Sequence, residues 1–440
     1  MAWRSGLIGC GLAIGMMASQ LPPAYSAPPA PERSQLANGI TVVTRQRPAS
    51  QVVAVDFVVR AGARYEDEDT SSAAHMLEHV LMLGTQKRPS RDQLLRSITS
   101  RGGDLGATAG REILEVPLTI ALPDLELGLD VLRDVVTASL FDERAFEAER
   151  QVVLHELDDR EDEPETQAGD VLADTIFDGH PLRHRPTGTR EGVIGLSAGQ
   201  IRQFWIERLV GGNIAIVVVS GLEHASVVER LAASFGDLPA GPLPPRNLAA
   251  FPVAGPKQTD LSAGSDQAHI FVGAPVSGVG SADRAALRIA KSVLSRASGR
   301  LYTEIRDKRG LAYSTYAALA QYVDGGLFYV YAGTEGGNAD TVLALLHSEL
   351  ARLREQSVGD AELNQAIGAE IGSQIVNEEA SGAEAGSLAR AEMFGTPPRE
   401  VEQAQLRAVT AADVQRVART YLAPDRLTVV MTRPGEEAER

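Results

Sequence analysis

Hydrophobic and polar residues alternate along the chain with two periods, one typical of strands and the other of helices. In the first half, β-branched or alternating stretches predict strands at residues 40–44, 52–59, 113–120 and 213–221. Stretches with apolar residues at every third or fourth position predict helices at residues 71–83, 91–100, 125–138, 142–159 and 201–209. Strands and helices mix throughout this half, which indicates an α+β fold.

The second half repeats this order of elements. We expect strands and helices, in chain order, at residues 270–273 (strand), 284–294 (helix), 312–319 and 327–332 (strands), and 341–353 and 360–375 (helices). A stretch rich in proline and glycine, from Leu238 to about Lys257, separates the two halves. We therefore predict two homologous domains, at residues 33–237 and 261–435, joined by a linker at residues 238–260.

The composition fits this division. A chain of 440 residues is longer than one ordinary core requires, so two or more domains are expected. Hydrophobic content of 44% and charged content of 23% are ordinary for a soluble globular protein. The formal net charge is −16 and no cluster of basic residues is present, which argues against nucleic acid as a partner.

The first 26 residues have the pattern of a cleavable signal peptide. Arg4 precedes an apolar run at residues 7–17, and Ala24-Tyr25-Ser26 forms a small-residue cleavage site. The run is too short to span a bilayer, so we expect cleavage after Ser26 and export to a bacterial periplasm. Cys10 lies in a sequence that mimics a lipoprotein cleavage site, which makes lipid anchoring the minor alternative. Cleavage would remove this single cysteine, which excludes disulfides and thiol catalysis in the mature chain.

The helix expected at residues 71–83 has clear ends. Ser71 and Ser72 are natural N-caps, and Gly84 is a natural stop. No proline or glycine interrupts the segment between them, so it should form about three helical turns.

This helix carries the residues of a metal site. His75 and His79 are four positions apart, so their side chains lie one turn apart on the same face, and Glu78 lies close to both. Imidazoles at this spacing can coordinate zinc together, and a nearby carboxylate can deprotonate a water molecule. The order His-x-x-Glu-His is the inverzincin signature.

A third protein ligand is expected on the helix at residues 142–159. Catalytic zinc takes three protein ligands and leaves one position for water. Glu149 and Glu156 are seven residues apart and therefore share one face of this helix. Glu156 is the candidate ligand, but periodicity alone does not distinguish either glutamate from a surface carboxylate in an acidic stretch.

The motif His75-Met76-Leu77-Glu78-His79, followed 77 residues later by Glu156, resembles the pitrilysin family of zinc peptidases. The resemblance implies that His75, His79 and Glu156 hold one zinc ion per chain. It implies that Glu78 is the catalytic base and that Glu149 supports a ligating histidine. It also implies that each domain is a mainly antiparallel sheet covered by helices. Such chains are similar to half of a clamshell, and two of them enclose a chamber for peptides or unfolded polypeptides.

The resemblance extends into the second domain, which carries no metal motif. Arg306 and Tyr313 match an arginine and a tyrosine that the family places opposite the zinc, so both are candidate substrate-binding residues. Without the resemblance, they would be interpreted as a surface charge and a strand core residue. A homodimer, or a heterodimer with a related subunit, would place this pair at the facing subunit's metal. A peptide would add a strand near residues 113–120, where Pro117 suggests a sheet edge.

One residue departs from the family pattern. The family has an asparagine where this chain has Gly106, within Gly-Gly-Asp-Leu-Gly-Ala at residues 102–107. That asparagine helps to hold the peptide, so Gly106 favours an alternative in which the chain is a catalytically weak or inactive subunit that binds peptides or scaffolds a partner. A periplasmic metal or peptide carrier is a third hypothesis, and it predicts binding without turnover.

Overall fold

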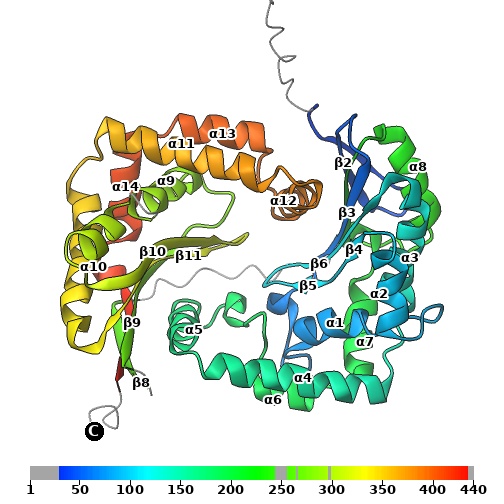
Figure 1. The fold of residues 1–440 in the computed structure, drawn as a ribbon, viewed down its shortest axis with the longest axis horizontal. Helices are drawn as coiled ribbons and strands as arrows, with labels where there is room; N and C mark the ends of the chain where they lie inside the picture. The colour runs from blue at the N-terminus through cyan, green and yellow to red at the C-terminus, as the bar shows by residue number, and fades with distance from the viewer. Residues whose placement is uncertain (1–28, 243–254, 264–265, 296–298, 435–440) are drawn as a thin grey trace, which may run out of the picture.

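The computed structural model describes residues 29–242, 255–263, 266–295 and 299–434. Within them the chain forms two halves, each built on one sheet with helices packed against it (Figure 1). This arrangement confirms the predicted α+β class. The predicted signal peptide and most of the predicted linker at residues 238–260 lie outside the described residues.

The first sheet comes entirely from the first half of the chain. Its strands are β1 (Glu32–Gln35), β2 (Thr41–Gln46), β3 (Val52–Val59), β4 (Asp104–Leu105), β5 (Thr108–Ala109), β6 (Leu114–Ala121) and β7 (Ile214–Ser220). Their order is β1-β2-β7-β3-β6-β4, and β5 also pairs with β6. The second sheet contains β8 (Lys257–Ala263), β9 (Gln267–Val276), β10 (Ala312–Gln321), β11 (Gly326–Glu335) and β12 (Thr428–Pro434). Their order is β10-β11-β9-β12-β8.

The two sheets have the same topology. When β8 is placed on β2 and β12 on β7, then β9, β11 and β10 fall on β3, β6 and the β4–β5 segment. Within the first sheet β2 and β7 are parallel, and within the second sheet the corresponding strands β8 and β12 are parallel as well. The other corresponding neighbours are antiparallel in both sheets. The second half is therefore a structural duplicate of the first. Strand β8 begins at Lys257, inside the stretch predicted as linker.

Helices cover one face of each sheet and close a separate hydrophobic core. In the first half they are α1 (Ala73–Leu81), α2 (Arg91–Thr99), α3 (Leu125–Ala138), α4 (Glu143–Glu161), α5 (Pro164–Ile176), α6 (Arg190–Gly195), α7 (Ala198–Arg208) and α8 (His224–Phe235). In the second half they are α9 (Arg284–Leu294), α10 (Ala339–Glu355), α11 (Asp360–Asn377), α12 (Ser381–Phe394), α13 (Arg399–Arg407) and α14 (Ala411–Tyr421).

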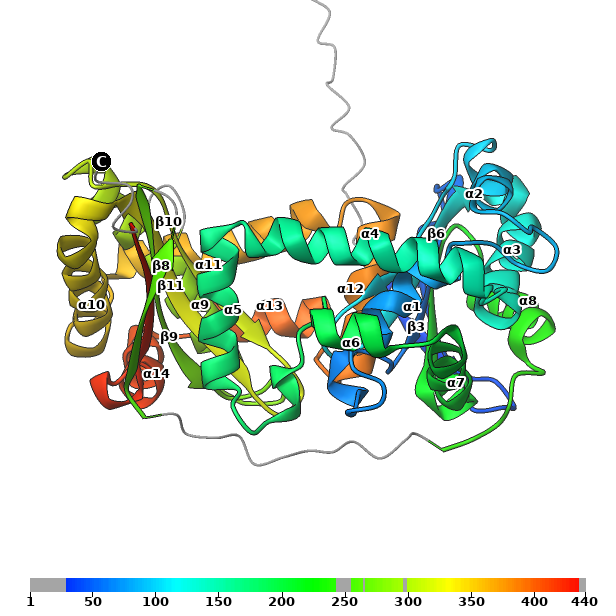
Figure 2. The ribbon, with the colours of Figure 1, turned by 90° about the horizontal axis from the view of Figure 1, so that it is seen from below.

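The two halves exchange one helix each. Helix α5 belongs to the first half but packs on the second sheet (Figure 2), against β9 and β12. Its residues Leu172 and Ile176 are buried beside Phe271. Helix α12 belongs to the second half but packs on β3 and β7 of the first sheet, where Leu388 and Met393 are buried. Each half therefore depends on the other to cover the second face of its sheet.

A buried cluster of charges also joins the halves. The guanidinium of Arg64, which precedes α1, donates to both carboxylate oxygens of Asp324 at 3.0 and 2.7 Å and forms an ion pair with Glu112. Asp324 lies in the turn between β10 and β11, and the backbone N–H of its neighbour Val323 donates to Glu112 at 3.2 Å. The second half is thus fixed to the segments that flank α1 and β6.

Strand β6 is not the outermost strand, which corrects the predicted edge. Its outer side is covered by two short strands, β4 and β5, with a gap between them. Pro117 lies opposite this gap, where its missing N–H breaks no ladder bond, and its carbonyl accepts from the N–H of Gly106 at 3.1 Å. On this side of the sheet the free backbone edge therefore belongs to residues 104–109, and β1 forms the opposite edge.

Candidate metal centre

Helix α1 begins differently from the sequence prediction. Ser72 precedes the helix in a left-handed conformation with φ of 71°, and neither it nor Ser71 caps the helix through its side chain. The carboxylate of Glu66 does so instead, accepting from the backbone N–H groups of Ser72 at 2.8 Å and Ala74 at 2.9 Å. The expectation of serine caps was therefore wrong, because a residue outside the helix satisfies its first amides.

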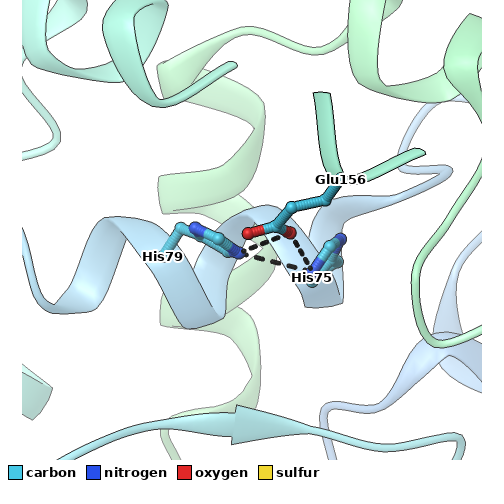
Figure 3. Close-up of side chains that lie close together, drawn as sticks. All are labelled: His75, His79 and Glu156. Atoms are coloured by element: carbon cyan, nitrogen blue, oxygen red, sulfur yellow. Dashed lines mark hydrogen bonds and ion pairs between the residues drawn. The ribbon is translucent and has the colours of Figure 1, made fainter. Parts of the chain in front are cut away.

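Helices α1 and α4 bring the three predicted ligands together. The Nε2 atoms of His75 and His79 are 3.3 Å apart, and the Oε2 atom of Glu156 is 3.5 Å from each of them (Figure 3). Among the described residues these are the three side chains that form a group able to hold a metal ion. Two turns of α1 and one turn of α4 thus meet at one point.

The far side of each imidazole is held by an acceptor. The Nδ1 atom of His75 lies 3.1 Å from the carbonyl oxygen of Thr187, and that of His79 lies 2.9 Å from the Glu149 carboxylate. Neither oxygen can donate, so each Nδ1 carries the hydrogen and each Nε2 presents a lone pair. Arg91 donates to the same Glu149 oxygen at 2.8 Å and fixes it in place.

This arrangement fits a zinc ion. Two lone pairs and one carboxylate oxygen converge, with no donor among them, so a cation bound between them would relieve their mutual repulsion. Burial, with a further contribution from His79, lowers the pKa of His75 to about 4, which keeps this imidazole neutral and able to ligate. Nitrogen and carboxylate ligands are those that catalytic zinc takes in proteins.

The centre is accessible from one side. The side chain of Glu156 is 45% exposed, whereas the two histidines are largely buried. A cavity of about 270 Å³ opens beside it, lined by His75, Glu156, Arg160 and neighbouring residues. A fourth ligand position would therefore face solvent and be available to water or substrate.

Glu78 lies next to the free edge of the first sheet. Its Oε2 atom accepts from the backbone N–H of Ala109 in β5 at 2.7 Å. Burial raises the pKa of Glu78, although the Ala109 bond partly opposes this effect. Gly106, at the other end of the same edge, has open space on its side-chain face, because a Cβ atom there would meet nothing within 4 Å.

Arg306 and Tyr313 contact each other rather than the histidines. The Arg306 guanidinium lies 5.3 Å from the ring centre of Tyr313 and 4.8 Å from that of Tyr302. Tyr313 is 79% exposed, and neither residue forms a hydrogen bond or ion pair with the three ligands in the described part of the chain. Sequence reasoning missed Tyr302, which lies one helical turn before Arg306.

Comparison with known proteins places these observations in a family. The family described as Insulinase (Peptidase family M16) matches residues 41–190, and the one described as Peptidase M16 inactive domain matches residues 195–369. An uncharacterized zinc protease of Streptomyces coelicolor is 31% identical and covers 89% of this chain and 87% of its own length. An uncharacterized zinc protease of Mycobacterium tuberculosis is 30% identical, covering 89% of this chain and 91% of that protein.

Solved structures share the fold. A crystal structure described as the peptidase M16 inactive domain from Pseudomonas fluorescens superposes with a TM-score of 0.84 at 19% identity, covering 92% of this chain and 98% of that one. A protease from Helicobacter pylori gives a TM-score of 0.83 at 23% identity and covers 93% of this chain and all of that one. None of the described helices has the length and apolar character needed to cross a membrane. The chain belongs to peptidase family M16, as its resemblance to the pitrilysin family predicts.

Proposed function

We propose that this protein is an exported zinc-dependent endopeptidase in which His75, His79 and Glu156 hold one zinc ion. The observation that carries this proposal is the convergence of three electron-pair donors whose orientation is fixed by Thr187 and Glu149. Relatives that align with most of this chain's length are named zinc proteases, which supports the same chemistry.

Zinc at this position supplies Lewis acidity toward a peptide carbonyl and lowers the pKa of a water molecule. Glu78 is the base in this proposal. The Ala109 N–H occupies its Oε2 atom, which leaves Oε1 to accept the proton of the attacking water and to pass it to the leaving amine. Partial burial favours this role, because a raised pKa brings the carboxylate closer to the pKa of the water that it deprotonates.

The substrate would lie along the free edge at residues 104–109. An extended peptide that pairs with this edge is recognised by its backbone, so selectivity for sequence would be low. The same strand segment carries Ala109, which holds Glu78, so peptide and base would be positioned by one element.

A peptide-binding or scaffolding subunit without turnover is the second candidate. It is favoured by Gly106, which offers no side chain to the peptide where family members have an asparagine. The two functions differ in whether a purified chain hydrolyses peptides.

The test is the Glu78→Gln variant. We expect it to retain zinc, measured by elemental analysis, and to lose cleavage of a quenched fluorescent peptide, because the amide cannot accept the proton. Glu143→Gln, which changes an exposed carboxylate near the start of α4, is the matched control and should cleave normally. Equal cleavage by wild type and Glu78→Gln would reject the mechanism, and zinc binding without cleavage by wild type would favour the second candidate.

Export is part of the proposal and has its own test. The leader at residues 1–26 supports a periplasmic location, with removal after Ser26. Amino-terminal sequencing of protein recovered from a periplasmic extract should begin at Ala27. Recovery of a full-length chain from the cytoplasm would contradict export.

A further inference from the structure

The second half contains a counterpart of the metal pocket. The duplicated topology places α9 on α1, α11 on α4 and α12 on α5. When the N-caps of the two helices, Gly359 of α11 and Asp142 of α4, are aligned, the position of Glu156 falls at Ser373, next to Gln374. Gln374 lines a cavity of about 340 Å³ between α9, α11, α12 and α13, as Glu156 lines the cavity beside the metal centre.

The second cavity is lined by cationic side chains instead of metal ligands. Helix α1 presents His75 and His79 four residues apart, and α9 presents Arg284 and Arg288 at the same spacing but two positions nearer the start of the helix, followed by Lys291. Cationic side chains outnumber carboxylates by six to four among the residues that line the cavity. Three of these cations pair with carboxylates outside the lining, Arg390 with Glu115, and Arg45 and Arg399 with Glu400, which leaves the three cations of α9 as the ones that belong to the cavity alone.

The three cations of α9 share two carboxylates. Glu402 forms ion pairs with Arg284 and, at 2.8 Å, with Arg288, while Glu370 lies 3.3 Å from Arg288 and 3.0 Å from Lys291. Both carboxylates are at most 9% exposed, and the cations are between 18 and 28% exposed. Two guanidinium groups and one ammonium carry three positive charges against the two negative charges of Glu370 and Glu402, so one positive charge of α9 is not balanced by these two carboxylates.

We propose that this cavity is an oxyanion-binding site, which takes a phosphate or the carboxylate of a peptide. An anion there would complete the charge balance of Arg284, Arg288 and Lys291, and the forked guanidinium groups match the geometry of both ligand types. The volume of about 340 Å³ holds a small anion or the end of a peptide but not a folded partner. The site does not use the metal centre, so it can be present whether or not the proposed peptidase activity is confirmed.

Lys291→Gln is the variant that tests this site with least disturbance, because Lys291 is partly exposed and forms one ion pair among the described residues. Binding of inorganic phosphate to the full chain is measured by isothermal titration calorimetry after the metal has been removed with a chelator. We expect Lys291→Gln to weaken phosphate binding about tenfold, as the loss of one charge-assisted hydrogen bond implies. Lys308→Gln is the matched control, because Lys308 is an exposed lysine of the same half that pairs with Glu304.

A second arm separates the two sources of the anion. The affinity of a short peptide with a free carboxyl terminus is compared with that of its amidated twin, in wild type and in Lys291→Gln. A preference for the free carboxylate that disappears in Lys291→Gln identifies the peptide terminus as a ligand, and an effect on phosphate alone identifies a free anion. The proposal is overturned if wild type binds neither phosphate nor the free carboxylate, or if Lys291→Gln and Lys308→Gln weaken binding equally.

Discussion

At the scale of single residues, the metal centre depends on groups that no motif contains. The spacing of His75, Glu78 and His79 predicts a shared helix face, and the structure brings His75 and His79 together with Glu156. The carbonyl of Thr187 that orients His75 was not predictable, because a backbone carbonyl is the same in every residue and its position depends on the tertiary fold. Glu66 was missed for a related reason, since it caps α1 from outside the helix.

Ser72 connects the metal helix to the segment that orients His75. Its hydroxyl accepts from the N–H of Thr189 at 2.9 Å and lies 3.2 Å from that residue's carbonyl oxygen, two residues after Thr187. We predict that Ser72→Ala raises the zinc dissociation constant about tenfold, because the loop that carries the Thr187 carbonyl is no longer anchored to α1. The constant is measured by competition with a chromophoric chelator.

Two further variants separate the effect of losing the Ser72 hydroxyl from the effect of relieving its left-handed backbone conformation. Ser72→Gly relieves the left-handed conformation but also removes the hydroxyl, so it should weaken zinc as Ser72→Ala does. Ser71→Ala is the control, since Ser71 makes no side-chain hydrogen bond within the described residues. Wild-type affinity in Ser72→Gly would show that the hydroxyl is not needed.

At the scale of elements, strongly periodic segments were predicted with the bounds that the structure shows. This holds for α3 and α9, whose apolar residues each face one core, and for β3, whose apolar residues alternate between the helix-covered core and the face under α12. Strands β4 and β5 were missed because two residues are too few to show a period. The packing of α5 and α12 was also not predictable, because an apolar helix face does not indicate which of two sheets it covers.

The edge formed by β4 and β5 suggests a gain-of-function test. A Cβ atom at Gly106 would meet nothing within 4 Å, and its backbone N–H would still donate to Pro117. We predict that Gly106→Asn raises kcat/KM on a fluorescent peptide about tenfold, because the amide adds a hydrogen bond to the bound strand. Gly106→Ala is the control and should leave kcat/KM unchanged. Equal effects of the two substitutions would show that the asparagine amide plays no part here.

Strand β3 carries a buried acid that should make stability depend on pH. Burial, and then the nearby Glu115, raise the pKa of Asp56 from 3.8 to about 7. The folded chain therefore holds this proton more tightly than the unfolded chain, so the contribution of Asp56 to the free energy of unfolding falls as pH rises from about 4 to about 7. Arg390 of α12 donates to Glu115 at 2.9 Å, so this acid pair lies where the exchanged helix meets the first sheet.

We predict that Asp56→Asn removes this dependence. The free energy of unfolding of Asp56→Asn should be close to that of wild type at pH 4 and exceed it by on the order of 4 kcal/mol above pH 7. Urea denaturation at several pH values measures the difference. Asp104→Asn, which changes an exposed carboxylate of the same sheet, should follow the wild-type curve. Parallel curves for wild type and Asp56→Asn would mean that Asp56 does not titrate in this window.

At the scale of the whole molecule, the halves are interlocked rather than merely linked. Each sheet is covered on one face by a helix of the other half, and Arg64 is buried against Asp324 of the β10–β11 turn. Separation of the halves would expose both apolar faces and leave a buried guanidinium without this partner, which is costly. We therefore expect one cooperative unfolding transition rather than two, and differential scanning calorimetry distinguishes these cases. Two resolved transitions would show that the halves unfold independently.

The position of Tyr313 bears on whether the active site forms between two copies of the chain. Tyr313 is 79% exposed and stacks on Arg306, and neither contacts the three ligands within the described chain. If the pair acts on the metal of a facing subunit, a mixed dimer of Glu78→Gln and Tyr313→Phe contains one site with both an intact base and an intact tyrosine. We predict that two preparations that are nearly inactive alone regain peptide cleavage when unfolded and refolded together. If the pair acts within its own chain, every site in the mixed dimer lacks one of the two groups, and a verified mixed dimer stays inactive.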